Sequence, residues 1–169
     1  IVDLLSSGII SIGISGLDIL KNENNSIQKN IKIIKKLNFG KASIMAATCI
    51  ESVDINSFAD IEEVSEEMRK KNQKLICSTK YKKLAQDYFI KKNIKNFSII
   101  TSHGATEVDP RNNISSIIVD VVESGKTLKS NNLKTFSDSK IMDTSACLFA
   151  NKKALKNKNV LKVLNLLSK

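Results

Sequence analysis

The distribution of apolar and polar residues predicts strands and helices that alternate along most of the chain. Short runs rich in Ile, Val and Cys are separated by longer segments in which apolar residues recur at helical spacing. The predicted strands are residues 9–14, 31–37, 42–48, 75–79, 97–101, 114–122, 133–136 and 141–150. The predicted helices are residues 17–21, 57–71, 80–92, 124–130 and 152–167. This alternation is typical of an α/β fold with largely parallel strands.

The composition is that of a folded globular protein. The chain has 169 residues, of which 41% are apolar and 26% are charged, enough to bury a core in one domain or in two small lobes. No apolar run approaches the roughly 20 residues of a membrane span, so we expect no membrane partner. The first residues lack both a starting Met and a basic segment and are therefore no signal peptide; we expect the true N-terminus to be missing.

The net charge of +10 comes from 27 Lys and Arg against 17 Asp and Glu, and only Arg69 and Arg111 are arginines. The lysines are scattered, and aromatic residues make up 5% with no Trp, so we expect no nucleic-acid partner. The most basic stretch, residues 152–162, is interpreted as a solvated helix face, with a polyanion contact as the alternative. The three cysteines are widely spaced in apolar runs. They indicate small buried side chains in a reducing cytoplasm, not a zinc site.

Four turns that follow predicted strands contain small or hydroxyl residues, which predicts one crevice for a phosphorylated ligand. The sharpest turn is residues 120–128, with the sequence DVVESGKTL. Gly125 would let a ligand approach the backbone, and the hydroxyls of Ser124 and Thr127 would complete an anion site at a helix start. The alternative is an ordinary helix with a Ser or Thr cap. The carboxylate of Asp120 could meet ribose hydroxyls or a metal, or could only cap the loop.

The other three turns are residues 13–18, 79–81 and 102–110, and each could also be a plain loop. In the last of them, Gly104 and Thr106 could approach a phosphate, and Glu107 could hold a hydroxyl or, indirectly, Mg²⁺. His103 is the only histidine. It has no Ser or Cys partner set by the sequence, so we expect it to serve a loop or cap and not to act as a general base.

Together these segments resemble the catalytic subunit of the ATP phosphoribosyltransferase family, which opens histidine biosynthesis. The resemblance follows the family's order along nearly the whole chain and is closest to its short form. The segments that carry it are residues 13–18 (GISGLD), 37–40 (LNFG), 75–81 (LICSTKY), 103–111 (HGATEVDPR) and 118–128 (IVDVVESGKTL). The last of these is the most specific, because it is similar to the family's phosphoribosyl loop.

The resemblance implies a two-lobed fold like that of type II periplasmic binding proteins, with mixed or parallel sheets flanked by helices. The first lobe would comprise residues 1–72 and 141–169 and would lack its opening strand and helix. The second lobe, residues 73–140, would carry the phosphoribosyl loop. The implied reaction transfers the phosphoribosyl group of phosphoribosyl pyrophosphate to N1 of ATP and releases pyrophosphate. Mg²⁺ would be the cofactor, bound through pyrophosphate and without a direct protein ligand.

The family's binding residues carry over onto two groups of positions. Phosphoribosyl pyrophosphate would be bound by Asp120, Glu123, Ser124, Gly125, Lys126 and Thr127. ATP would be bound by Gly16, Asp18, Thr79, Lys80, Gly104, Ala105, Thr106 and Glu107. Asp120 and Glu107 are the candidates for catalysis, through positioning and electrostatics, since this displacement needs no protein nucleophile. The implied partners besides the substrates are further copies of the chain and, for a short form, a subunit related to histidyl-tRNA synthetases.

Six residues depart from the family pattern outside the phosphoribosyl loop. Ser11 and Ser116 stand where the family has an acid, Asn113 and Asn132 replace a Gly, and Asp109 and Ser115 replace an Ala. The lost carboxylate at position 116 removes a candidate substrate contact. Two alternatives to the enzyme therefore stay open: a non-catalytic two-lobed module that binds a small molecule, and an inactive fragment of the enzyme.

Overall fold

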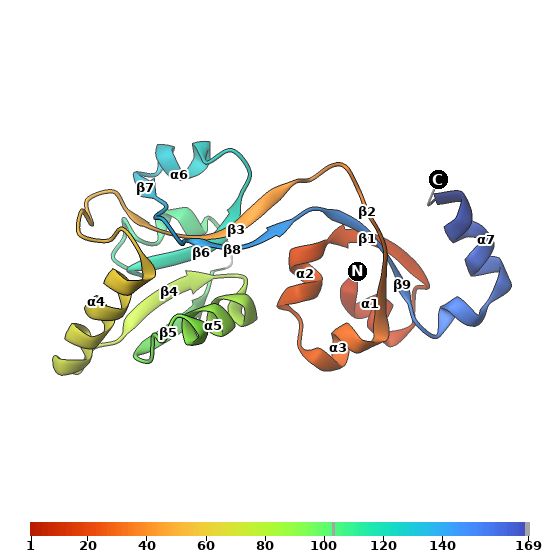
Figure 1. Cartoon of the computed structure of the whole chain (residues 1–169), viewed down its shortest axis with the longest axis horizontal. Coiled ribbons are helices and arrows are strands. Elements are labelled where there is room, and N and C mark those ends of the chain that lie inside the picture. Colours follow the sequence, from red (N-terminus) through yellow and green to blue (C-terminus); the bar gives the residue numbers. More distant parts are fainter. Residues whose placement is uncertain (103, 168–169) are drawn as a thin grey trace. The chain divides into compact units, whose positions relative to one another are not determined.

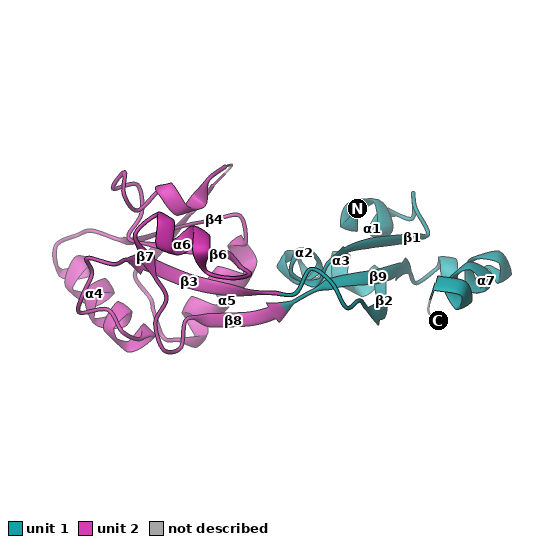
Figure 2. Cartoon of the chain, turned by 90° about the horizontal axis from the view of Figure 1, so that it is seen from above, with its two compact units in different colours: residues 1–41, 144–169 teal, residues 42–143 magenta. Residues whose placement is uncertain are grey.

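A computed structural model describes residues 1–102 and 104–167, and its chain forms two compact units. Unit 1 comprises Ile1–Lys41 and Thr144–Lys169, and unit 2 comprises Ala42–Asp143 (Figure 2). The first predicted lobe boundary, at residue 72, is therefore wrong, because residues 42–72 supply a central strand and a covering helix of unit 2. The predicted return of the chain at residue 141 lies close to the observed return at Thr144.

Unit 1 is built on a three-stranded antiparallel sheet with the order β1-β9-β2. Its strands are β1 (Ile12–Gly16), β2 (Ile31–Lys36) and β9 (Ala146–Asn151). Its helices are α1 (Val2–Ser7), α2 (Leu17–Asn22), α3 (Asn25–Asn30), the 3₁₀ turn η2 (Ala154–Lys156) and α7 (Lys158–Leu167). Because β9 is the central strand, Leu148 and Ala150 are buried, and they pack with Leu164 of α7.

Unit 2 contains a six-stranded mixed sheet with the order β5-β4-β6-β3-β7, and β8 also pairs with β3. Its strands are β3 (Ala42–Cys49), β4 (Leu75–Thr79), β5 (Phe97–Thr101), β6 (Ile117–Val122), β7 (Leu133–Lys134) and β8 (Lys140–Thr144). Its helices are α4 (Phe58–Lys70), α5 (Lys82–Lys91), the 3₁₀ turn η1 (Thr106–Val108) and α6 (Lys126–Ser130). β4 pairs in parallel with β5 and β6, whereas β3 is antiparallel to its neighbours β6 and β7. This confirms a mixed α/β fold and corrects the expectation of largely parallel strands.

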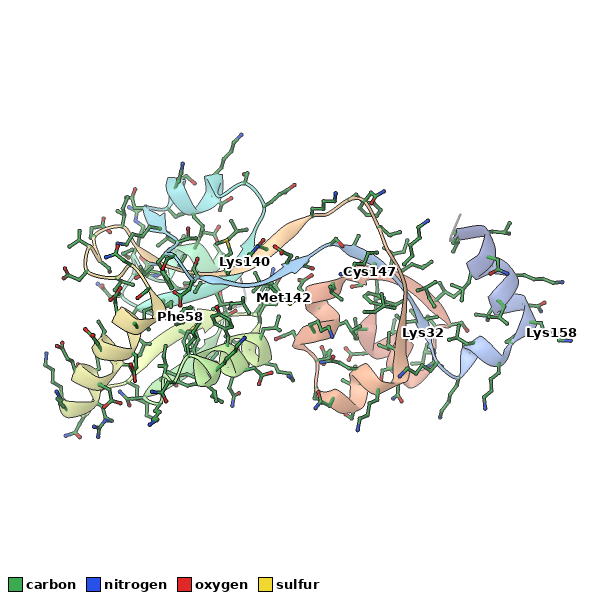
Figure 3. The ribbon with its side chains drawn as sticks, viewed as in Figure 1. Lys32, Phe58, Lys140, Met142, Cys147 and Lys158 are labelled. Atoms are coloured by element: carbon green, nitrogen blue, oxygen red, sulfur yellow. The ribbon has the colours of Figure 1, made fainter. Side chains whose placement is uncertain are left out.

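Helices cover both faces of the sheet of unit 2. Successive residues of a strand point to opposite faces, so neighbouring residues of one strand pack with different helices. On one face, Ala46 and Ile117 pack with side chains of α4 and α5. On the other face, Ala47 and Ile118 pack with Leu128 of α6 (Figure 1). Phe58, the first residue of α4, lies in the larger of these two clusters (Figure 3).

The predicted strands over residues 75–79 and 97–101 are confirmed with the same bounds. The single strand expected over residues 141–150 is wrong. It is divided at Ser145 because β8 pairs with β3 in unit 2, whereas β9 pairs with β1 and β2 in unit 1. The sequence pattern also missed α3, whose first turn is capped by the side chain of Asn24. Among the described helices, none is long and apolar enough to cross a membrane.

Candidate functional site

Three parallel strands of unit 2 end at one edge of its sheet, and the predicted site residues of this unit follow those ends. β4 lies between β5 and β6 and runs parallel to both. Thr79, the last residue of β4, is paired with Thr101 at the end of β5 and with Val119, three residues before the end of β6. Ligands of open α/β sheets bind in the crevices beside such ends. The fold therefore brings together residues 79–80, 104–107 and 120–127, which are separate in the sequence.

Thr79 closes the turn from β4 into α5. Its side chain is fully buried, and its hydroxyl donates a hydrogen bond to the carbonyl of Val119 (2.5 Å) and accepts one from the backbone N–H of Tyr81 (2.8 Å). The hydroxyl thus joins β4 to β6 and fixes the direction of the chain at Lys80. Because the side chain of Thr79 is occupied within the fold, Lys80 is the group that this turn presents to a ligand.

Asp120 and Lys80 face each other from neighbouring strands. The Lys80 ammonium lies 3.9 Å from Oδ1 of Asp120, and 19% of the Asp120 side chain is exposed. The same carboxylate oxygen accepts a hydrogen bond from the backbone N–H of Val121 (2.7 Å). Burial raises the pKa of the Asp120 carboxyl, and the neighbouring Glu107 carboxylate adds to the rise, while Val121 and Lys80 oppose it. Two carboxylates and an ammonium therefore share this edge, an arrangement suited to sugar hydroxyls and to a metal-bound anion.

Glu107 reaches this edge through the 3₁₀ turn η1 in the connection between β5 and β6. Thr106 is buried and anchors the turn, and Glu107 beside it is half-buried. Gly104 and Ala105 are exposed, and a side chain at Gly104 would meet no neighbouring atom within 4 Å. The predicted role of His103 concerns a residue outside the described part of the chain.

The turn from β6 into α6 holds the predicted phosphoribosyl loop. Gly125 adopts a left-handed conformation (φ 72°, ψ 0°) and forms the N-cap of α6, and no side chain in this fully described turn caps the helix. The alternative of a Ser- or Thr-capped helix is therefore wrong. The first N–H groups of a helix lack partners within the helix. Leu128 is buried and anchors the turn, whereas Glu123, Ser124, Lys126 and Thr127 are exposed.

Gly16 and Asp18 lie in unit 1, at the turn from β1 into α2. A Cβ at Gly16 would come within 2.3 Å of Oδ1 of Asp18, so a larger residue there would force the Asp18 side chain to move. The Asp18 carboxylate is buried and accepts a hydrogen bond from the hydroxyl of Thr144 (2.7 Å). This carboxylate is therefore held within unit 1, and the prediction that Asp18 contacts ATP stays a prediction.

Two contacts at these positions could not be found from the sequence. Lys80 and Asp120 are brought together only by the pairing of β4 with β6, and Asp18 finds Thr144 only because the chain returns to unit 1. No pattern in the sequence indicated a pocket in unit 2 that lies at the opposite end of the strands and is lined by residues such as Cys49 and Ser115.

Comparison with known proteins gives one consistent result. The model of the ATP phosphoribosyltransferase family (HisG) matches residues 1–169. A relative from Mesorhizobium japonicum named ATP phosphoribosyltransferase is 32% identical over 152 residues, which are 89% of this chain and 66% of the relative. The chain thus spans about two thirds of the length of the curated relatives it matches.

Solved structures agree on the fold. An ATP phosphoribosyl transferase (HisG:HisZ) complex from Thermotoga maritima superposes with a TM-score of 0.76 at 22% identity, covering 99% of this chain and 71% of that one. The substrate-binding protein of an amino acid ABC transporter superposes with a TM-score of 0.59 at 16% identity, covering 97% of this chain and 66% of that one. The fold is therefore that of the two-lobed type II binding proteins, as the sequence resemblance implied. With a family model that matches every position from 1 to 169, the chain belongs to the ATP phosphoribosyltransferase family.

Proposed function

We propose that this chain binds phosphoribosyl pyrophosphate at the carboxyl edge of β4, β5 and β6. As part of the family's enzyme, it would transfer the phosphoribosyl group to N1 of ATP in the first step of histidine biosynthesis. The observation that carries the proposal is the meeting of Lys80, Glu107 and Asp120 beside the left-handed turn at Gly125, in a chain that the family model matches throughout.

Each part of this edge has a role in the proposed reaction. The exposed turn at residues 123–127 receives the 5-phosphate through backbone N–H groups and hydroxyls. Asp120 and Glu107 accept hydrogen bonds from the ribose hydroxyls, and Lys80 offers its ammonium to the departing pyrophosphate. The bond from the anomeric carbon to pyrophosphate breaks as the bond to N1 of ATP forms. The carboxylates stabilise the positive charge that develops on the ribose.

The residues at this edge fit a Mg²⁺ ion that arrives with the substrate. Among the described residues, no group of three or more His, Cys, Asp or Glu side chains is close enough to hold a metal ion by itself. Mg²⁺ commonly binds substrate phosphates and keeps several waters. It would therefore be carried by pyrophosphate, and the carboxylates of Asp120 and Glu107 at this edge would attract it without binding it directly. When bound, Mg²⁺ would neutralise charge on the pyrophosphate leaving group.

The remaining parts of the proposal concern ATP, partners and location. Gly16, Asp18, Gly104, Ala105 and Thr106 are proposed to contribute to the ATP site. The short form is proposed to act with further copies of itself and with a subunit related to histidyl-tRNA synthetases. The likeness of its fold to the HisG:HisZ complex supports this. The working location is proposed to be the cytoplasm.

Product formation tests the proposal. The chain would be incubated with phosphoribosyl pyrophosphate, ATP and Mg²⁺, with and without the synthetase-like subunit of the same organism. Mass spectrometry would then detect ATP that has gained a phosphoribosyl group. We expect product from the unaltered chain and about 100-fold less from Asp120→Asn, because a charge that stabilises the transition state is lost. Asp87→Asn, on the exposed surface of α5, should leave product formation unchanged. Binding of phosphoribosyl pyrophosphate without product in either mixture would favour the non-catalytic binding module instead.

A further inference from the structure

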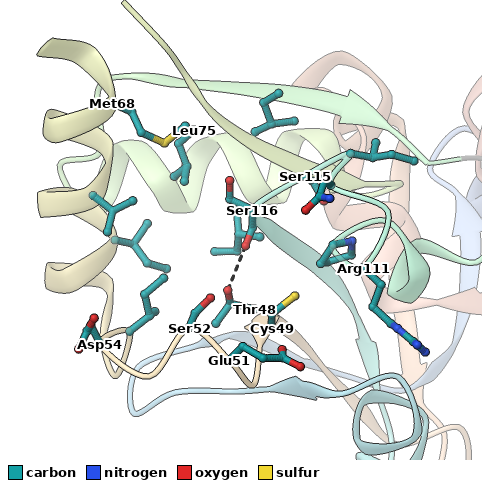
Figure 4. A pocket seen from close by; sticks show the side chains of 18 of the residues that line it. Thr48, Cys49, Glu51, Ser52, Asp54, Met68, Leu75, Arg111, Ser115 and Ser116 are labelled. Carbon is teal, nitrogen blue, oxygen red and sulfur yellow. Dashed lines mark hydrogen bonds between the residues drawn. The ribbon is translucent and has the colours of Figure 1, made fainter. Parts of the chain in front are cut away.

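We propose that unit 2 contains a second small-molecule site, at the sheet edge opposite the phosphoribosyl turn, which takes an uncharged ligand with an apolar body and a hydrogen-bonding group. The site is a pocket of about 1070 Å³ at the amino ends of β4 and β6 and the carboxyl end of the antiparallel β3 (Figure 4). Ile117, which lines the pocket, and Asp120 of the proposed substrate site lie three positions apart on β6, about 10 Å at the usual rise of a strand, and their side chains point to opposite faces of the sheet. The pocket is therefore separate from the proposed substrate site.

One side of the pocket is apolar. Met68 of α4 and Leu75 of β4 lie on the same side (Figure 4), and Ile61, Val64 and Ile117 also line the pocket. These side chains belong to the core of unit 2 or pack against it, so the wall is firmly held. An apolar ligand body would remove part of this wall from water, which is the main driving force for small-molecule binding in such pockets.

The other side of the pocket offers hydrogen-bonding groups. Ser115 is 7% exposed, and its hydroxyl has no hydrogen-bond partner among the described residues. Buried hydroxyls are almost always paired, so rotation of the Ser115 side chain toward the pocket would give its hydroxyl a partner in a ligand. Thr48 is 1% exposed, and its hydroxyl donates to the carbonyl of Ser116 (3.0 Å) and keeps the capacity to accept a hydrogen bond. A ligand that both donates and accepts hydrogen bonds would pair with the hydroxyl groups on this side of the pocket.

The charged residues around the pocket balance each other. Glu51 and Asp54 carry negative charges, and Lys74 and Arg111 carry positive charges. A ligand with a net charge would meet a like charge on the rim as well as an opposite one, so the rim gives no overall preference for an anion or a cation. Transfer of a charged group onto the apolar wall is also costly. The pocket therefore favours a neutral ligand.

Cys49 provides a reporter for this site. It lines the pocket and is half-buried, whereas Cys77 and Cys147 are fully buried. Burial and, secondarily, the carboxylate of Glu51 raise the pKa of the Cys49 thiol, so alkylation is best followed at alkaline pH. A ligand in the pocket would cover the thiol and slow its reaction.

The test compares three ligands of the same shape: 2-naphthylmethanol, 2-naphthoate and 2-naphthylmethylammonium. The rate of Cys49 alkylation by iodoacetamide in the full chain would be measured by peptide mass spectrometry with each ligand. We expect the neutral alcohol to slow alkylation about fivefold at about four times its Kd. The two ions should slow it less at the same concentration. Equal or stronger protection by either ion would overturn the assignment of a neutral ligand, and no protection by any of them would overturn the site.

Two variants separate binding in the pocket from binding elsewhere. Ile114 lines the pocket and is 45% exposed, so Ile114→Trp should narrow the pocket without disturbing the core. Ile90 on α5 is 60% exposed and does not line it, so Ile90→Trp is the matched control. Protection by the alcohol should fall in Ile114→Trp and persist in Ile90→Trp, with folding of both variants checked by circular dichroism. Unchanged protection in a folded Ile114→Trp would contradict the proposal.

Discussion

The carboxylate of Asp18 and the hydroxyl of Thr144 are hydrogen-bonded to each other across 126 positions of the sequence. The Thr144 hydroxyl donates to Oδ1 of Asp18 (2.7 Å) and accepts from the backbone N–H of the same residue (3.1 Å). Both residues are buried. The pair fixes the start of α2 to the point where the chain re-enters unit 1.

Removal of this hydroxyl should destabilise unit 1. Thr144→Val keeps the shape of the side chain but leaves the buried carboxylate without this donor, at a cost of about 1–3 kcal/mol in the free energy of unfolding. Thr144→Ser keeps the hydroxyl and is the control. Urea unfolding followed by circular dichroism measures both variants, and equal stability of Thr144→Val and Thr144→Ser would show that the hydrogen bond is unimportant.

Phe58 should be a major contributor to the stability of unit 2. It is 1% exposed, and its ring makes edge contacts with Tyr88, Phe89 and Phe136 at centroid distances of 5.2, 5.5 and 5.1 Å. Phe58→Ala should lower the free energy of unfolding by about 3–5 kcal/mol, because it leaves a cavity among these rings. Phe39→Ala, at a position that is 60% exposed, should change it by less than about 0.5 kcal/mol in the same denaturation measurement.

Asp138 should make the stability of unit 2 depend on acidic pH. Its carboxylate accepts hydrogen bonds from the backbone N–H of Phe58 (2.8 Å) and from the Lys92 ammonium (2.5 Å). Partial burial acts to raise the pKa of Asp138, but these two donors outweigh it and the pKa is lowered. A lowered carboxyl pKa stabilises the fold above the unfolded value of about 3.9 and ceases to do so as the pH falls through the folded value.

The free energy of unfolding should therefore decline when the pH is lowered below about 4, and this decline should be smaller in Asp138→Asn. Near neutral pH the variant should lose about 1–2 kcal/mol, since the side chain is 35% exposed and solvent weakens the contact. Denaturant midpoints measured from acidic to neutral pH give both quantities. Parallel curves for the two proteins across that range would contradict the role of Asp138.

Asp120 should lower the stability of unit 2 at neutral pH and strengthen the binding of phosphoribosyl pyrophosphate. Burial raises its pKa, with Glu107 adding to the rise, so the folded chain holds the ionised form at a cost in free energy. Asp120→Asn should therefore unfold at a higher denaturant concentration at neutral pH, while its affinity for phosphoribosyl pyrophosphate falls. Denaturation and calorimetry of the same preparation test both halves. A variant that gains stability without losing affinity would remove Asp120 from the site.

Lys80→Met and Glu107→Gln test whether these two side chains affect the pKa of Asp120. The Lys80 ammonium opposes the rise in the pKa of Asp120, so its loss should raise that pKa further, and Glu107→Gln should lower it. Titration of the Asp120 carboxyl by NMR resolves the two directions. Identical titration curves in both variants would mean that the three side chains are not coupled.

The local pattern predicted individual elements better than it predicted their partners. β4 and β5 were predicted with their observed bounds, because each is a short apolar run closed by polar turn residues. The division of residues 141–150 at Ser145 was missed, because both halves are strands and only their pairing in different sheets separates them. The assignment of β3 to unit 2 was missed for the same reason.

The segments of the candidate site could likewise be predicted from the sequence, whereas the contacts between them could not. The turns at residues 79–81 and 120–128 could be found in the sequence from their composition and from the family resemblance. The ion pair between Lys80 and Asp120 required the order of the strands in the sheet, and the buried hydroxyl of Ser115 required the whole packing of unit 2. Contacts across strands have no fixed spacing in the sequence, so periodicity carries no information about them.

Calorimetric titration with phosphoribosyl pyrophosphate and Mg²⁺ tests the central claim most directly, with Gly125→Val and Gly8→Val beside the unaltered chain. Both glycines are left-handed, at φ +72° and +82°, so Val costs about 1–2 kcal/mol of backbone strain at either position. Only Gly125 lies in the turn that we assign to the phosphate. We expect binding by the unaltered chain and by Gly8→Val, and no measurable binding by a folded Gly125→Val. Undiminished affinity in Gly125→Val would contradict the account.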